Sequence, residues 1–132
     1  MTPRSKAMDF LARREYGFEE LYLRLSKYFD KNDVRDVVSA LRDEGLQSDN
    51  RFAEALTQRR FNQGYGPNYV CRELLAKKID SEIVENVISK HNWRENISNV
   101  VNKHTCKTAQ QLQRYLLYKG YDFEMINQVV KT

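Results

Sequence analysis

Apolar residues recur along this chain at the spacing of helix faces. Leu21, Leu25 and Phe29 follow one another at intervals of four residues, which places them on one side of a helix. Similar spacing occurs in three further sets: Val34, Val38 and Leu41; Ile83 and Val87; and Leu112 and Leu116. No stretch shows the sustained alternation of apolar and polar residues between turn residues that predicts strands. The sequence therefore predicts an all-α fold.

Glycines and capping residues divide the chain into segments of helix length. The five glycines all lie between apolar segments, where a residue that tolerates positive φ can end a helix. Pro67 suits a first helical turn, Thr108 with Gln111 predicts a capping box, and Asp80 and Asp122 predict N-caps. We expect nine helices, at residues 5–16, 18–29, 32–44, 49–63, 67–78, 81–91, 93–104, 109–119 and 123–131.

The nine predicted helices form three similar groups. Aligning Leu25, Leu74 and Leu116 brings three other apolar positions into register: Leu21, Val70 and Leu112; Val34, Ile83 and Met125; and Val38, Val87 and Val129. Such self-similarity predicts a modular array. We expect three tandem three-helix repeats, at residues 1–48, 49–92 and 93–132. A unit of about 40 residues is too small to hold a core comfortably alone, so neighbouring units should contact one another in an elongated, curved array.

Composition excludes two broad classes of protein. Hydrophobic residues make up 41% of the 132 residues and charged residues 30%, which is too apolar for a disordered chain and too charged for a membrane protein. The longest run without a charge, residues 61–71, is well short of the roughly 20 apolar residues that a spanning helix needs. Residues 1–6 contain no apolar core of the kind that signal peptides have. We therefore expect a cytoplasmic protein that does not contact membranes.

The cysteines and histidines show no metal-binding pattern. Cys71 and Cys106 form no C-x-x-C pair, and together with His91 and His104 they match no known zinc-ligand spacing. In a reducing compartment we expect both cysteines to remain thiols. The sequence thus predicts no metal and no other cofactor.

The sequence also contains no recognisable catalytic motif. Residues 64–67 (Gly-Tyr-Gly-Pro) lack the following Lys-Ser/Thr and the preceding strand of a phosphate-binding loop. Neither a Gly-x-Ser-x-Gly nor a His-Glu-x-x-His motif is present. Asp30, Asp33 and Asp36 lie near a predicted helix start, where the helix dipole already favours negative charge. We therefore expect a protein that is not an enzyme.

The net charge of +4 conceals larger local charges of opposite sign. Residues 17–48 and 79–92 each carry a net −2, residues 49–78 and 93–132 each carry +3, and residues 1–16 carry +2. Basic side chains interleaved with aromatic ones can follow a phosphate backbone, although solvated helix faces carry charges of the same kind. The alternation of sign favours a partner with both charges, such as a protein–DNA complex, over bare DNA.

Several segments carry a family likeness. Residues 49–55 (Asp-Asn-Arg-Phe-Ala-Glu-Ala), the Arg-Arg pair at 59–60 and the Gly-Tyr-Gly-Pro at 64–67, with Glu-Leu at 73–74, closely resemble the RecX family. Residues 11–15 (Leu-Ala-Arg-Arg-Glu), with Glu-Leu at 20–21 and Gly-Leu at 45–46, and residues 113–121 (Gln-Arg-Tyr-Leu-Leu-Tyr-Lys-Gly-Tyr) extend the likeness over nearly the whole chain. Two features depart from the family pattern: the N-terminus is short beside members with a long basic leader, and residues 22–25 (Tyr-Leu-Arg-Leu) are more apolar than usual.

The resemblance implies a bacterial negative regulator of the RecA recombinase that acts by binding. Proteins of this family lie in the groove of the RecA filament on single-stranded DNA and contact more than one protomer. They limit filament extension or favour disassembly, and so lower ATP hydrolysis, strand exchange and SOS co-protease activity. The implied partners are the RecA filament and single-stranded DNA, with weaker duplex binding left open, and we expect a monomer.

The hypothesis assigns filament or nucleic-acid binding mainly to basic residues: Arg13, Arg14, Arg51, Arg59, Arg60, Tyr65, Arg72, Lys77, Lys78, Arg114 and Lys119. Which of them would contact DNA and which RecA stays open at this stage. One alternative is a helical-repeat scaffold that binds protein without nucleic-acid contact. Another is a duplex reader similar to helix-turn-helix proteins, although no helix is marked as a base-reading element.

Overall fold

The computed structural model describes residues 1–130, and within them every regular element is a helix. The predicted all-α fold is therefore confirmed, and each predicted helix is present with slightly different ends; residue 131, predicted to close the last one, lies outside the described residues. The helices are α1 (Pro3–Arg13), α2 (Phe18–Leu25), α3 (Lys31–Asp43), α4 (Asp49–Asn62), α5 (Pro67–Ala76), α6 (Ser81–Ser89), α7 (Trp93–Lys103), α8 (Ala109–Lys119) and α9 (Phe123–Val129).

Side-chain caps begin seven of the nine described helices, three of them at the predicted residues Asp80, Thr108 and Asp122. The carboxylates of Asp80 and Asp122 accept hydrogen bonds from backbone N–H groups in the first turns of α6 and α9, as predicted. The predicted capping box at Thr108 forms only in part. Thr108 accepts from the backbone N–H of Gln111, but the Gln111 side chain accepts from the N–H of Lys107 instead of that of Thr108.

Three clusters of buried apolar side chains form the cores of the described residues. Helices α1–α3 enclose the first, α4–α6 the second together with Trp93, and α7–α9 the third. Leu25, Leu74 and Leu116, on which the repeat alignment rests, are each 0% exposed. Each cluster therefore contains one of these three leucines, which lies on the second helix of its group.

In the third helix of each group the alignment holds only in part. Val34 and Val38 are buried as predicted, and so is Val87 in the second group. Ile83, Met125 and Val129 are only half-buried, and the adjacent core positions are Val84, Ile126 and Val130. The stretch from the aligned leucine to the start of the third helix is one residue shorter before α3 than before α6 and α9. A fixed offset from that leucine therefore misses the inward face at three of the four positions in α6 and α9, because successive residues of a helix point about 100° apart.

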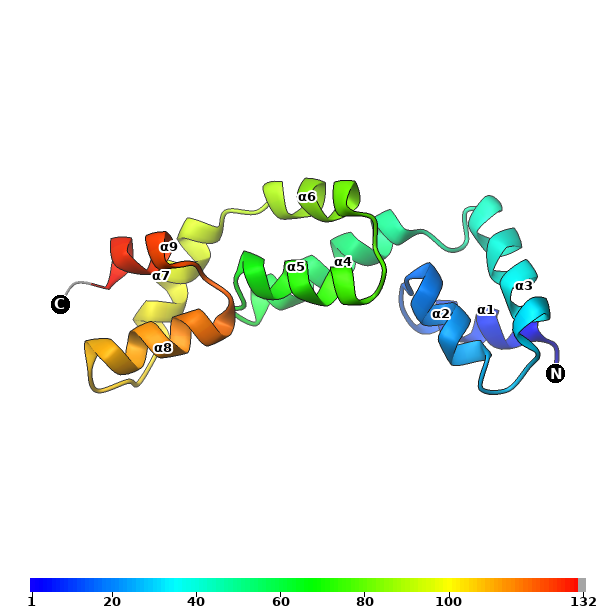
Figure 1. Ribbon diagram of the computed structural model, residues 1–132, viewed down its shortest axis with the longest axis horizontal. Helices are drawn as coiled ribbons and strands as arrows, with labels where there is room; N and C mark the ends of the chain where they lie inside the picture. Colours follow the sequence, from blue (N-terminus) through cyan, green and yellow to red (C-terminus); the bar gives the residue numbers. More distant parts are fainter. Residues whose placement is uncertain (131–132) are drawn as a thin grey trace.

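The three helical groups follow one another in a curved row with the chain termini at opposite ends (Figure 1). This arrangement confirms the predicted elongated array of helical repeats. Division of the chain after residues 48 and 92 stays a prediction, because segments on both sides of these points contact each other, as described below. None of the described helices is long and apolar enough to cross a membrane.

Candidate partner-binding surface

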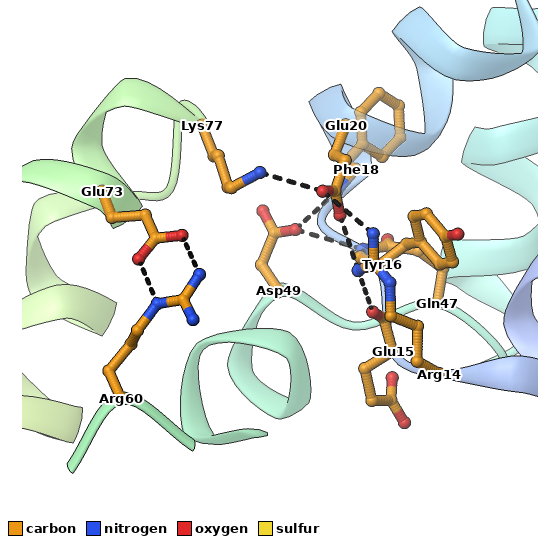
Figure 2. A network of polar contacts seen from close by, with 10 residues as sticks. All are labelled: Arg14, Glu15, Tyr16, Phe18, Glu20, Gln47, Asp49, Arg60, Glu73 and Lys77. Atoms are coloured by element: carbon orange, nitrogen blue, oxygen red, sulfur yellow. Dashed lines mark hydrogen bonds and ion pairs between the residues drawn. The ribbon is translucent and has the colours of Figure 1, made fainter. Parts of the chain in front are cut away.

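The first and second helical groups meet through charged and polar side chains (Figure 2). The carboxylate of Asp49, at the start of α4, accepts from the backbone N–H of Phe18 at 2.8 Å and from the side-chain amide of Gln47 at 3.1 Å. Gln47, which is buried, also donates to the carbonyl of Tyr16 at 3.1 Å. These bonds fix the turn between α1 and α2 against the start of α4. We call this contact the first junction.

Glu20 is the ionic centre of the first junction. Its carboxylate accepts from Arg14 of the same group at 3.1 Å and from Lys77 of the second group at 2.9 Å. Burial raises the pKa of the Glu20 carboxyl, but the hydrogen bonds from Arg14 and Lys77 outweigh this, so its pKa lies below the usual value. Lys77, predicted as a binding residue, thus links two helical groups across 57 residues of sequence.

A second ion pair joins α4 to α5 within the second group. Arg60 donates through Nε and Nη2 to the two carboxylate oxygens of Glu73, both at 2.8 Å. The hydrogen bond from Arg60 holds the pKa of the Glu73 carboxyl below its usual range. A bidentate pair of this kind fixes the guanidinium in one orientation. Arg59, one residue earlier, is exposed, and its side chain has no hydrogen bond or ion pair with the described residues.

The second and third helical groups meet backbone to backbone. The N–H of Gly66 donates to the carbonyl of Lys119 at 2.7 Å, and that of Asn68 donates to the carbonyl of Gly120 at 2.9 Å. A Cβ on Gly66 would lie 2.6 Å from the carbonyl carbon and oxygen of Gly120, a separation that real Cβ atoms do not show. Glycine at 66 is therefore required by close approach of two chain segments. We call this contact the second junction.

Buried polar side chains complete the second junction. Asn96 donates through its amide to the carbonyls of Phe61 and Tyr65, and the hydroxyl of Tyr121 donates to the carbonyl of Gly64. Burial raises the pKa of Tyr121 to about 12, further above neutral pH than that of an ordinary phenol, which is itself protonated there and able to donate. Asn96, near the start of α7, thus helps to hold the last two groups together.

Two predicted binding residues, Tyr65 and Lys119, also belong to the second junction. The ammonium of Lys119 lies 3.6 Å from the ring centroid of Tyr65 and donates to the carbonyl of Gln63 at 3.2 Å. Lys119 is only 9% exposed, and burial lowers the pKa of its amine. The Tyr65 ring stacks on Tyr69 with their centroids 4.1 Å apart. Both predicted residues therefore have partners within the chain.

The two junctions use equivalent positions of the repeat. When Leu25 is aligned with Leu74, Gly17 aligns with Gly66. When Leu74 is aligned with Leu116, Lys77 aligns with Lys119. A Cβ on Gly17 would lie 3.2 Å from the ring of Phe52, which is a close contact with a side chain instead of with backbone. In each case the turn between the first two helices of one group packs against the next group.

Among curated proteins, this chain matches relatives over almost its whole length. A protein named "Regulatory protein RecX" from Legionella pneumophila (strain Corby) is 36% identical over 135 residues, which cover 95% of this chain and 90% of that protein. A protein of the same name from Chromohalobacter salexigens is 31% identical over 134 residues, and the match covers 88% of that protein. The chain belongs to the RecX family. Residues 48–88 match the family model described as "RecX, second three-helix domain".

Solved structures from the same family share the fold of this RecX-family chain. A crystal structure of RecX from Lactobacillus salivarius has a TM-score of 0.77 at 18% identity, covering 97% of this chain and 92% of that one. A second crystal structure, of a protein named regulatory protein RecX, has a TM-score of 0.78 at 16% identity, and the match covers 69% of that chain. At these identities the likeness supports the arrangement of helices and not the role of any residue.

In this RecX-family chain the predicted binding residues separate into two sets. One set is held in contacts with other described residues: Arg14, Arg51, Arg60, Tyr65, Lys77 and Lys119. The other set has exposed side chains that make no hydrogen bond or ion pair with residues 1–130: Arg13, Arg59, Arg72, Lys78 and Arg114. The first set takes part in contacts within the fold, and the second set consists of five cations on its surface.

A pocket lies where the first junction meets the Arg60–Glu73 pair. It has a volume of about 360 Å³, and its lining includes Arg14, Arg59, Arg60 and Lys77. Glu20 and Glu73 line it as well and neutralise part of this charge. Within residues 1–130, no group of three or more His, Cys, Asp or Glu side chains is placed to hold a metal ion. The pocket therefore offers positive charge without the ligands of a metal centre.

Proposed function

We propose that this chain is a negative regulator of the RecA recombinase that binds in the groove of the RecA filament on single-stranded DNA. In this role it blocks filament extension or promotes disassembly, and so lowers ATP hydrolysis, strand exchange and SOS co-protease activity. Membership of the RecX family over nearly the full chain is the observation that carries the proposal. No covalent chemistry is required of the chain, because binding alone changes the stability of the filament.

The shape of the array supports a long partner. Three helical groups follow one another in a curved row, so contacts can extend along a filament groove instead of gathering at one point (Figure 1). The two junctions tie these groups together through named hydrogen bonds, which reduces the entropy lost when all groups bind at once. An array held in this way is suited to a surface that repeats along one direction.

The distribution of exposed charge supports a partner made of both protein and nucleic acid. Five of the predicted binding residues are exposed cations whose side chains have no hydrogen bond or ion pair to residues 1–130: Arg13 on α1, Arg59 on α4, Arg72 on α5, Lys78 just after α5 and Arg114 on α8. Acidic segments at residues 17–48 and 79–92 interrupt them. A surface of alternating sign suits phosphates at some points and charged protein side chains at others.

The proposal is tested against a protein-only scaffold by binding at several salt concentrations. We expect labelled chain to bind RecA-coated single-stranded DNA more tightly than the same DNA without RecA, because only the filament offers both partners. Each neutralised phosphate adds about 0.7 to the slope of log affinity against log salt concentration. Fluorescence anisotropy with and without RecA measures both quantities. A flat salt dependence in both cases would favour the scaffold, and equal affinity for naked DNA would contradict filament binding.

A further inference from the structure

The second helices of the last two helical groups carry the same exposed stripe. On α5 it consists of Asn68, Arg72 and Leu75, and on α8 of Gln110, Arg114 and Leu117. The two sets superpose when Leu74 is aligned with Leu116, and their spacing places each set on one helix face. All six side chains are exposed, the two leucines to 45% and 43%. We call these the α5 stripe and the α8 stripe.

Folding of the chain does not explain the stripes. Neither leucine belongs to a hydrophobic cluster, and the side chains of Arg72 and Arg114 make no hydrogen bond or ion pair with residues 1–130. The first group folds without such a stripe, because α2 has Glu19, Leu23 and Ser26 at the equivalent positions. The repeat therefore tolerates other side chains there, and the amide–arginine–leucine pattern is a surface feature shared by two groups.

Each stripe has the chemistry of a protein-binding surface. An exposed guanidinium with no internal partner can take a carboxylate in a bidentate pair. Burying the leucine one turn further along the helix stabilises a complex only where the partner supplies apolar surface. A phosphodiester backbone supplies none. On the α8 stripe, Gln110, Arg114 and Leu117 also line a pocket of about 300 Å³ together with Phe123, and Phe123 is 67% exposed.

Two equal stripes on neighbouring groups suit a partner that presents the same site twice. We propose that the α5 and α8 stripes bind equivalent sites on consecutive subunits of a protein filament, each site offering a carboxylate beside an apolar surface. This inference rests on the proposed function, because it takes the RecA filament as the repeating partner. α5 and α8 lie in neighbouring groups along the array (Figure 1), and simultaneous contact at both makes the second contact intramolecular.

The test uses leucine-to-glutamine variants, which remove apolar surface without changing charge or helix propensity by much. We compare Leu75→Gln, Leu117→Gln and the double variant in binding to RecA-coated single-stranded DNA. Because one stripe remains in each single variant, we expect similar losses of about tenfold in affinity, and a loss of about a hundredfold or more in the double variant. The control is Leu23→Gln on α2, a leucine exposed to 56% outside both stripes, which should bind within about twofold of the natural chain.

The outcomes separate this inference from the function on which it rests. If the natural chain binds the filament and the double variant binds equally well at full helicity by circular dichroism, the stripes are not the contact and the inference is wrong. If only one of the two single variants loses filament affinity, the two sites are not equivalent. If the natural chain sediments alone as a dimer and the double variant as a monomer, the stripes bind a second copy instead. Failure of the natural chain to bind the filament would overturn the proposed function as well.

Discussion

Replacing Leu74 with alanine is expected to lower the free energy of unfolding by about 2–5 kcal/mol. Leu74 is 0% exposed and lies in the core formed by α4, α5 and α6, with Phe52 and Val70 in the same cluster. Removing three carbon atoms there leaves a cavity that the neighbouring helices can fill only in part. Urea unfolding followed by circular dichroism measures the change.

The adjacent residue supplies a matched control. Leu75 is 45% exposed and belongs to no core cluster, so Leu75→Ala should change the free energy of unfolding by about 0.5 kcal/mol or less. Equal destabilisation by the two substitutions would show that Leu74 does not occupy the core position on which the repeat alignment rests.

Replacing Gly66 with alanine is expected to separate the second and third helical groups. The added Cβ would lie 2.6 Å from the backbone of Gly120 and 2.8 Å from the Tyr121 ring. Relief of this clash requires the segments to move apart and stretches the 2.7 Å bond from Gly66 to the carbonyl of Lys119. Overpacking of this kind costs about 1–3 kcal/mol, and each weakened hydrogen bond adds about 0.5–1.5 kcal/mol.

Urea unfolding of Gly66→Ala, with small-angle X-ray scattering of the folded variant, tests this expectation. Gly45→Ala is the control, because Gly45 lies outside both junctions and a Cβ there meets no atom within 4 Å. Its φ of +79° strains an alanine there by about 1–2 kcal/mol. The Gly45→Ala variant therefore measures the effect of backbone strain without a steric clash. An unchanged scattering profile and a smaller loss of stability for Gly66→Ala than for Gly45→Ala would contradict the account of the second junction.

Local features of the fold could be predicted from the sequence, and its long-range contacts could not. Helical spacing and capping residues identify all nine described helices, because both depend on residues three or four positions apart. The junctions join residues such as Glu20 and Lys77, 57 positions apart, and no periodicity reports such pairs. The third-helix register failed at Ile83, Met125 and Val129, because it depends on a turn that differs by one residue between groups.

Charge counts identified the basic segments but not the accessible cations. Arg59 and Arg60 are neighbours in sequence, yet only Arg60 reaches a carboxylate, since successive residues of a helix point about 100° apart. Lys77 and Lys119 contribute to the basic excess while being held in the junctions. Their recurrence at the same repeat position was visible in the sequence and could have indicated a structural role. The stripes of α5 and α8 could likewise be found by alignment, although their exposure required the structure.

The most direct test of the account is a titration of the natural chain into RecA-coated single-stranded DNA while ATP hydrolysis is followed. Binding along the groove should limit the length of active filament. The rate of hydrolysis should therefore fall with added chain and approach a low plateau at concentrations well below those needed to coat naked DNA. A rate that stays constant while the chain is present in excess over RecA would contradict it.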